Sequence, residues 1–311
     1  MIEKEITFSS GEAQLAGTLC MPEDDGQFPC VLMIHGSGPV DRDENAPHAR
    51  IDAFNTIAHH LAGKGVASLR YDKRGCGKSG GIFDQTGFYD LAQDGMAAYR
   101  YLTSQDRIDK DKVFILGHSE GSMIAPRIHL SYTAVSGLIL IGVQARKLEE
   151  GLKYQARMII EDVKHGSGFT RFAARIAWKI LRYDPLKTQK VLFERVRRTD
   201  KDSFRYKGQK INAKWLREHL EYDPVYTMRN VSCPILAITG DKDIQVDPQD
   251  AALVAELAKG EVEYHIVPNL THILRTDGGP PSIFNYKHLL KQPMDERVLQ
   301  IIDDWLQKRL R

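Results

Sequence analysis

The pentapeptide Gly-His-Ser-Glu-Gly at residues 117–121 follows the G-x-S-x-G pattern and could hold a nucleophilic serine, Ser119. The apolar run 113–116 stands directly before it, and the helix-compatible stretch 122–125 follows. A nucleophile elbow needs this order, because a strand must end abruptly and a helix begin at once for the serine to sit on a strained turn. The flanking glycines leave room for neighbouring strands and permit unusual backbone angles. The pattern therefore indicates a nucleophile elbow at Ser119 rather than an ordinary strand–helix turn.

A serine nucleophile needs a base at neutral pH, and the base needs an acid that holds its tautomer. After an elbow, the acid precedes the histidine in the chain. Asp241 and Asp243 both follow the strand expected at 234–238. We favour Asp243, because its longer offset from the strand lets the carboxylate reach the next loop, and Asp241 is the alternative. Asp247 is more typical of a helix N-cap.

The base is expected at His272, one of five candidates among the six histidines that follow Ser119. It comes after the last expected strand, 262–267, in the loop where the base should enter. His265 lies inside that strand and would point into a packed face. The other three, on the elbow helix or far from the relevant strand ends, are His129, His219 and His288.

Two backbone N–H groups should receive the negative charge that develops on a substrate carbonyl oxygen. Glu120, the residue after the nucleophile, supplies one of them. The other is expected from the small residues at 35–38, directly after a buried-type strand at 30–34. We expect the Ser37 N–H to be this donor, with Gly36 as the alternative.

Other chemistries have weaker signals. Residues 75–79 end like a phosphate-binding loop, but Asp72 occupies the required first glycine position. Residues 36–41 fail the last position of the dinucleotide-binding fingerprint. The chain has no H-E-x-x-H motif, no EF-hand loop and no cluster of cysteine and histidine. We therefore expect neither a metal nor a cofactor.

The bulk properties are those of a globular enzyme, with 311 residues, 42% hydrophobic and 27% charged residues. The net charge of +2 gives no indication of a nucleic-acid partner. No apolar stretch approaches the roughly 18 residues of a membrane span, and residues 1–6 do not resemble a signal peptide. The cysteines show no C-x-x-C spacing, which favours reduced thiols and a cytoplasmic location; they are Cys20, Cys30, Cys76 and Cys233.

The order of elements predicts an α/β fold with one insertion. Apolar strands alternate with helices, which implies a mostly parallel sheet covered on both faces. We predict a core of residues 1–144 and 221–311 and a helical cap at 145–220, inserted over the carboxyl edge of the sheet, where ligands bind. Residues 145–230 hold 21 basic and 11 acidic side chains. This basic stretch is interpreted either as a solvated face or as a lid that attracts an anionic substrate.

Three aromatic side chains of the insertion, Tyr154, Phe172 and Trp178, have helical spacing. They could line an acyl pocket, although aromatics in this pattern are more often part of a core.

Taken together, the segments 35–39, 71–79, 117–121, 240–243 and 271–272 resemble those of α/β-hydrolases. The resemblance covers nearly the whole chain outside the insertion. More narrowly, the chain is similar to bacterial serine carboxylesterases of the dienelactone-hydrolase-like group, which carry a helical cap after the sixth strand. Dienelactone hydrolases proper have a cysteine at the position of Ser119, and dehalogenases of the same fold have an aspartate. The resemblance therefore disfavours both of those activities.

These observations lead to the expectation of a serine carboxylesterase that acts on a small ester through an acyl-enzyme. Ser119 would attack the ester, His272 would move the proton, and Asp243 would orient His272. The alternatives are an acyl-CoA thioesterase, for which the basic insertion is the motive, and a peptidase of the same fold. A non-catalytic ligand-binding protein of this fold is a further alternative.

Overall fold

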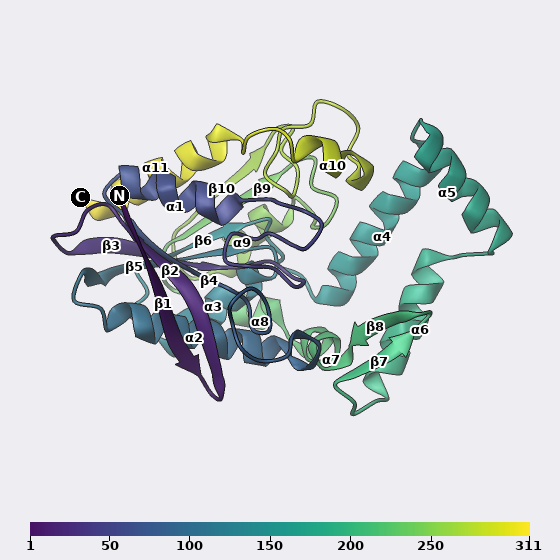
Figure 1. Ribbon diagram of the computed structural model, residues 1–311. Coiled ribbons are helices and arrows are strands. Elements are labelled where there is room, and N and C mark those ends of the chain that lie inside the picture. The colour runs from purple at the N-terminus through teal and green to yellow at the C-terminus, as the bar shows by residue number, and fades with distance from the viewer.

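The computed structural model describes all 311 residues and contains an eight-stranded sheet with helices on both faces (Figure 1). The strand order is β1-β2-β4-β3-β5-β6-β9-β10. All neighbouring strands from β4 to β10 pair in parallel, whereas β1 and β2 form an antiparallel pair at one edge. The strands are β1 (Ile2–Ser10), β2 (Ala13–Met21), β3 (Phe28–Ile34), β4 (Ala67–Tyr71), β5 (Ile108–His118), β6 (Gly137–Ile141), β9 (Ile235–Gly240) and β10 (Val262–Val267).

Two hydrophobic clusters explain why the strand sequences are almost continuously apolar. Along β3, Leu32 belongs to a cluster that includes residues of α2, α3 and α9, and the next residue, Met33, belongs to a cluster that includes residues of α1 and α11. Successive side chains of a strand point to opposite faces, so both faces of this sheet are buried. The helices of the core are α1 (Ala53–Gly63), α2 (Phe88–Thr103), α3 (Gly121–Ser131), α8 (Pro224–Met228), α9 (Asp250–Leu257), α10 (Tyr286–Leu289) and α11 (Glu296–Leu310), with short 3₁₀ turns η1 (Phe83–Gln85) and η2 (Ile283–Asn285). The predicted mostly parallel α/β fold is confirmed.

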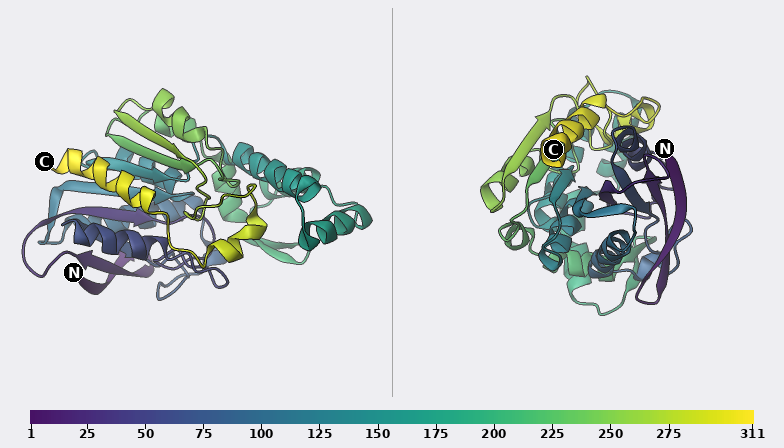
Figure 2. Two further views of the ribbon diagram at one scale, coloured as in Figure 1. Left: turned by 90° about the horizontal axis from the view of Figure 1, so that it is seen from above. Right: turned by 90° about the vertical axis from the view of Figure 1, so that its left-hand side faces the viewer.

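The chain between β6 and β9 leaves the sheet and extends beyond the carboxyl ends of the parallel strands (Figures 1 and 2). Its elements are α4 (Leu148–His165), α5 (Phe169–Ile180), α6 (Pro185–Arg197), β7 (Ser203–Tyr206), β8 (Gln209–Asn212) and α7 (Ala213–Glu221). None of the helices in the protein has the length and apolar character needed to cross a lipid bilayer.

The β7–β8 hairpin corrects the expectation that this segment lacks strands. Its turn consists of Lys207 and Gly208, whose φ angles are +48° and +83°. Positive φ at both turn residues matches the right-handed twist of paired strands and favours a two-residue hairpin. The strands are only four residues long, so their alternation is too short to stand out beside the long helices.

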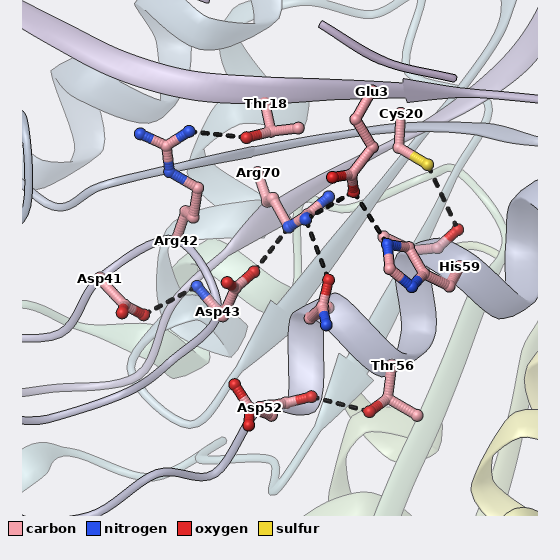
Figure 3. A network of polar contacts seen from close by, with 12 residues as sticks. Glu3, Thr18, Cys20, Asp41, Arg42, Asp43, Asp52, Thr56, His59 and Arg70 are labelled. Atoms are coloured by element: carbon pink, nitrogen blue, oxygen red, sulfur yellow. Dashed lines mark hydrogen bonds and ion pairs between the residues drawn. The ribbon is translucent and has the colours of Figure 1, made fainter. Parts of the chain in front are cut away.

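A polar network fixes the long loop between β3 and α1 against the antiparallel edge of the sheet (Figure 3). Arg70 of β4 is nearly fully buried and donates to Glu3 at 2.8 Å and to Asp43 at 2.6 Å. Arg42 of the loop donates to Thr18 of β2 at 2.6 Å and forms an ion pair with Asp72 at 2.8 Å. The loop that follows residues 35–38 is thereby tied to β2 through Thr18, to β4 through Arg70, and to Asp72 directly after β4.

Candidate active site

Ser119 occupies the turn between the end of β5 and the start of α3 with a φ of +53°. Positive φ is uncommon for a residue with a side chain and marks stored strain. The two glycines of the motif are required by space: a Cβ at Gly117 would overlap the Gly121 carbonyl, and a Cβ at Gly121 would overlap the carbonyl of Ile34. The Ser119 N–H is anchored to the carbonyl oxygen of Ile141 on β6 at 2.8 Å. This is the backbone geometry of a nucleophile elbow.

The loops after β9 and β10 bring a buried carboxylate and a buried imidazole together. Oδ2 of Asp243 lies 2.6 Å from Nδ1 of His272, and both residues are at most 5% exposed. The other carboxylate oxygen, Oδ1, accepts the N–H groups of Gln245 at 2.8 Å and Val246 at 3.0 Å. Asp243 is therefore fixed on both sides, and the Nδ1 proton of His272 has one acceptor in direct reach.

The other acids of this region serve different purposes. Asp241 is exposed and accepts the N–H of Asn269 at 2.6 Å. Asp247 pairs with Arg146 at 2.8 Å, and its carboxylate also accepts the N–H of Gln249 at 3.0 Å, directly before α9.

The imidazole of His272 lies beside the elbow. Its ring centroid is 5.0 Å from that of His118, the residue directly before Ser119. The Ser119 hydroxyl makes no hydrogen bond with His272; in catalytic sites such contacts often tighten only when substrate binds. The remaining candidate histidines contact other groups. His129 lies near the hydroxyl of Ser232, and His219 stacks on Phe88. His265 pairs with Glu263, and His288 is exposed on α10.

The loop after β3 and the elbow present two N–H groups without partners in the chain, those of Ser37 and Glu120. The Gly36 N–H, by contrast, donates to Oε1 of Glu44 at 2.7 Å. This engagement disfavours Gly36 as the second oxyanion donor, because its proton is already bound by a buried carboxylate.

A buried polar cluster around the Glu120 side chain was not predicted from the sequence. Lys73 lies 3.2 Å from the Glu120 carboxylate and also donates to the carbonyl of Gly36. Trp215 of α7 donates its indole N–H to the same carboxylate. Burial raises the pKa of Glu120, but Lys73, His219 and the two donated hydrogen bonds outweigh it and lower the pKa. Glu120, the residue after Ser119, is thus an anion held between Lys73 and α7.

A second buried pair, Glu44 and His118, also escaped sequence analysis. Oε2 of Glu44 lies 2.7 Å from Nδ1 of His118, directly beside the elbow. No local pattern connects these two residues, because Glu44 lies in the loop after β3 and His118 is the last residue of β5. Only the tertiary structure brings them together.

A cavity of about 330 Å³ opens next to Ser37. The residues that line it are Ser37, Gly38, Phe83, Leu192, Lys210, Ile211, Asn212, Trp215 and Leu216. Most come from the segment between β6 and β9, so that segment forms much of the wall near the elbow. The wall contains no acidic side chain.

The three aromatic residues of the insertion have three different environments. Trp178 lines an apolar cavity of about 590 Å³ within the segment between β6 and β9. The Tyr154 hydroxyl donates to the backbone carbonyl of Asp243 at 3.2 Å. Phe172 is 53% exposed and belongs to none of the three hydrophobic clusters, contrary to the expectation of a core residue.

Comparison with known proteins agrees with this geometry. The family model described as Serine aminopeptidase, S33, matches residues 48–278. The chain is similar to Esterase EstD of Thermotoga maritima, with 28% identity over 308 residues that cover 98% of this chain and 68% of that protein.

Among solved structures, Est1E from Butyrivibrio proteoclasticus with bound ferulic acid superimposes with a TM-score of 0.65 and 19% identity, covering 98% of this chain and 99% of that one. The proline iminopeptidase of Mycobacterium smegmatis superimposes with a TM-score of 0.62 and 15% identity, covering 98% of both chains. These two similarities show the fold alone. Because the family model covers most of the sequence, the chain belongs to the family described as Serine aminopeptidase, S33, and the predicted α/β-hydrolase identity is confirmed.

Proposed function

We propose that this protein is a serine esterase that hydrolyses carboxylic esters through an acyl-enzyme. The observation that carries the proposal is the buried His272–Asp243 pair, with its 2.6 Å contact, beside an elbow that holds Ser119 at positive φ. The similarity to an esterase along 98% of the chain supports the same chemistry.

In the proposed reaction, the Ser119 hydroxyl attacks the ester carbonyl carbon while Nε2 of His272 takes its proton. His272 can do this because its other proton, on Nδ1, is held by Asp243. The imidazolium then gives its proton to the departing alcohol, and the acyl group remains on Ser119. Water repeats the sequence: His272 removes its proton, the water oxygen attacks the acyl carbon, and Ser119 recovers its hydrogen.

The oxyanion of each tetrahedral intermediate would be held by the N–H groups of Glu120 and Ser37. Neither N–H has a partner in the chain, so neither must break a bond to receive the charge. Donors that are already in place cost no reorganisation when charge develops, and each is worth about 3–4 kcal/mol in other enzymes. The negative side chain of Glu120 is neutralised by Lys73, so it adds no net charge to the oxyanion site.

The segment 145–220 would act as a cap that shapes the substrate pocket. Ile211, Trp215 and Leu216 of this segment line the cavity beside Ser37, together with Phe83 of the core. Trp215 also holds the Glu120 carboxylate, so the cap is joined to the residue that follows the nucleophile. An apolar wall of this kind fits the acyl or alcohol part of an ester.

The family description raises the question of aminopeptidase activity. A peptide N-terminus is an ammonium group, which a buried site must pair with a carboxylate. The cavity beside Ser37 has no acidic residue in its wall and contains Lys210 instead. The nearby Glu120 carboxylate is already engaged by Lys73 and Trp215. The pocket therefore favours a neutral or anionic ester over an amino-terminal peptide.

The first test is hydrolysis of p-nitrophenyl esters with acyl chains of two to twelve carbons. Wild type, Ser119→Ala and the control Ser131→Ala, which changes an exposed serine at the end of α3, should be compared. We expect turnover by wild type and the control and a loss of several orders of magnitude in Ser119→Ala, because triad members act as a unit. Wild-type activity in Ser119→Ala would refute the assignment of the nucleophile.

Parallel assays with acyl-CoAs and with amino-acid p-nitroanilides separate the remaining activities. The thioesterase alternative is motivated by a cavity of about 560 Å³ between α4 and α6, whose wall includes Lys153, Arg157, Lys187, Lys190 and Arg197. If that surface binds the CoA phosphates, affinity for acyl-CoA should fall steeply with added salt. Preferred cleavage of p-nitroanilides would contradict the esterase proposal.

A further inference from the structure

Beside the elbow lies a buried ion pair that none of the proposed catalytic steps uses. The side chains of Glu44 and His118 are 3% and 4% exposed, and Oε2 of Glu44 is 2.7 Å from Nδ1 of His118. Neither of these two atoms has a hydrogen bond of good geometry, so the attraction between them is mainly that of opposite charges. Burying two charges carries a large desolvation penalty, so a pair of this kind is more readily explained by a role in function than by a gain in stability.

Both ring nitrogens of His118 face acceptors. Nδ1 faces the Glu44 carboxylate, and Nε2 lies 3.1 Å from the backbone carbonyl oxygen of His272. A neutral imidazole carries one N–H, whereas an imidazolium carries two, so this arrangement suits the charged ring. Burial lowers the pKa of His118, but Glu44, the His272 carbonyl and Asp243 outweigh it, and the pKa is raised.

The second oxygen of Glu44 continues the connection. Oε1 accepts the N–H of Gly36 at 2.7 Å, and Gly36 directly precedes the oxyanion donor Ser37. One unbroken set of contacts therefore runs from the oxyanion loop through Glu44 and His118 to the backbone of His272. It joins two of the groups that must surround the substrate carbonyl.

The backbone around Glu44 is built to hold this side chain in place. Glu44 has a φ of +64°, a strained angle for a residue with a side chain. The two preceding residues are both anchored. Arg42 forms an ion pair with Asp72 at 2.8 Å, and Asp43 forms one with Arg70 at 2.6 Å (Figure 3). The strain persists because the neighbouring ion pairs fix the loop.

We propose that Glu44 and His118 are positioning residues for the hydrolytic reaction. Their charged pair holds the His272 backbone and the Gly36 N–H at a fixed separation, so the base and the Ser37 N–H keep their places around Ser119. The paired charges also let His118 donate to His272 without adding net charge beside it. This inference rests on the proposed function.

The decisive variant is Glu44→Gln, whose amide oxygen can still accept the Gly36 N–H but carries no charge. His118 then loses its counter-charge. We expect kcat per active site to fall roughly 10- to 100-fold with KM changed less than about twofold, since small misplacements of reacting groups have effects of this size. Active sites are counted by stoichiometric labelling of Ser119 with a phosphonate.

The pH profile supplies a readout that a purely structural role would not move. His118 is faced by Glu44 from the loop after β3 and by His272 and Asp243 from the loops after β10 and β9. In wild type, kcat should fall at alkaline pH as His118 loses its proton. Without Glu44, burial lowers the pKa of His118, so this alkaline fall should begin at lower pH in Glu44→Gln.

A matched control is Asp303→Asn, which neutralises another buried carboxylate paired with a histidine, His60, at 2.6 Å. That pair joins the last turn of α1 to α11, away from the elbow. It should leave kcat and the pH profile unchanged. If Glu44→Gln behaves like this control, the positioning role is wrong. Absence of phosphonate labelling in wild type would instead refute the proposed function.

A double-mutant cycle keeps the proposal testable if Glu44→Gln is poorly folded. His118→Gln and the double variant Glu44→Gln/His118→Gln should each be labelled and assayed. Because Glu44 and His118 act through a single ion pair, kcat of the double variant should be no lower than that of the more impaired single variant. Strictly multiplicative losses would show that they act independently and would overturn the inference.

A different observation concerns α5, which turns its apolar face outward. Its inner face is basic: Arg171 pairs with Asp162 at 2.6 Å, and Arg175 donates to the carbonyl groups of Val163 and Gly166 at the end of α4. Figure 1 places α5 at the end of α4 that is remote from the sheet. The large apolar side chains on its outer side are Phe169, Phe172, Ile176, Ile180 and Leu181, with exposed fractions of 84%, 53%, 43%, 74% and 73%.

The positive charge around the apolar face of α5 indicates which kind of partner would bind there. Residues 164–198 contain ten lysines and arginines and two acidic residues, a net charge of +8. Lys179 of α5 and Arg182, two residues after its end, are exposed and have no ion-pair partner, and Lys187 and Lys190 of the next helix, α6, are likewise exposed and unpaired. Two copies joined through this face would bring like charges together, whereas an anionic lipid surface would satisfy both the cations and the apolar side chains. We infer that α5 docks on an anionic lipid surface.

The test is co-sedimentation of the full chain with vesicles of phosphatidylcholine, with and without 30% phosphatidylglycerol. Wild type and the control Tyr264→Glu, which adds charge to an exposed aromatic residue on β10, should bind the anionic vesicles in a salt-sensitive way. Ile176→Glu/Ile180→Glu should bind at least tenfold more weakly. Equal binding of that variant, no binding by wild type, or a lipid-free dimer that the variant dissociates would each overturn the inference.

Discussion

Replacing Asp243 by asparagine tests the proposed triad most sharply, because the structure dictates how the new amide must point. Oδ1 of Asp243 accepts two backbone N–H groups, from Gln245 and Val246. An amide NH₂ cannot take that place without opposing two donors, so the asparagine oxygen must remain there. The NH₂ group is then directed at Nδ1 of His272.

The consequence is a change of tautomer. A donor facing Nδ1 moves the imidazole proton to Nε2, where His272 can no longer accept the proton of Ser119. Loss of the correct tautomer in a Ser-His-Asp site lowers kcat by on the order of 10⁴-fold. At about 1.4 kcal/mol for each factor of ten, this corresponds to about 5 kcal/mol of transition-state stabilisation. The fold should be retained, since the exchange conserves shape and the two backbone contacts.

The assay is hydrolysis of a short p-nitrophenyl ester at pH 8, normalised to correctly folded protein by circular dichroism. Asp241→Asn is the matched control: it changes an exposed aspartate two residues away that bonds only the Asn269 N–H. We expect the control to stay within about threefold of wild type. If Asp243→Asn kept more than a tenth of wild-type kcat, or if Asp241→Asn lost more than Asp243→Asn, the reasoning would be refuted.

Three further predictions concern the scaffold of the site. Gly121→Ala should lower the free energy of unfolding by about 1–3 kcal/mol in urea denaturation, because its Cβ would overlap the carbonyl at the end of β3. Gly63→Ala, whose Cβ meets no neighbour, should not do so. Equal effects of the two substitutions would contradict the packing argument. Burial, opposed by Glu120, lowers the pKa of His219 to about 4, so the folded state rejects a proton that the unfolded chain binds below about pH 6.5. Stability should therefore fall between pH 6.5 and 4, and fall less in His219→Phe; unchanged acid sensitivity of that variant would argue against this assignment. Lys73→Met leaves the buried carboxylate of Glu120 without its cation and should lower the free energy of unfolding by about 3–5 kcal/mol in the same assay. An unchanged free energy of unfolding would mean that Trp215 and solvent are enough to stabilise the Glu120 carboxylate.

Much of the fold could be predicted from sequence because its signals are local. The continuous apolar runs of β3, β5 and β6 predict a sheet buried on both faces, and the two hydrophobic clusters explain that composition. The β7–β8 hairpin was missed because its short strands and its Lys-Gly turn lie in a basic, helix-rich segment. The division into a core and a cap at residues 145–220 stays a prediction, as does the similarity to the dienelactone-hydrolase-like group.

The sequence by itself determined which residues could do the chemistry: an elbow pattern is local, and the order serine, acid, histidine follows from the strand order. Ser119, Asp243 and His272 could therefore be proposed from their places after expected strands. Only the tertiary structure decided which groups are free to act. The choice between Ser37 and Gly36 depended on whether a distant carboxylate, Glu44, already held one of their N–H groups.

The same limit explains the other unforeseen contacts of the site. Glu44 with His118 and Glu120 with Trp215 join residues that are far apart in the chain, without a periodic pattern to connect them. Local spacing reports which backbone conformation a segment prefers, because side chains a few residues apart share a face. Which buried charge meets which partner is decided when the sheet edge, the loops and the cap converge, and that convergence is a property of the packed molecule.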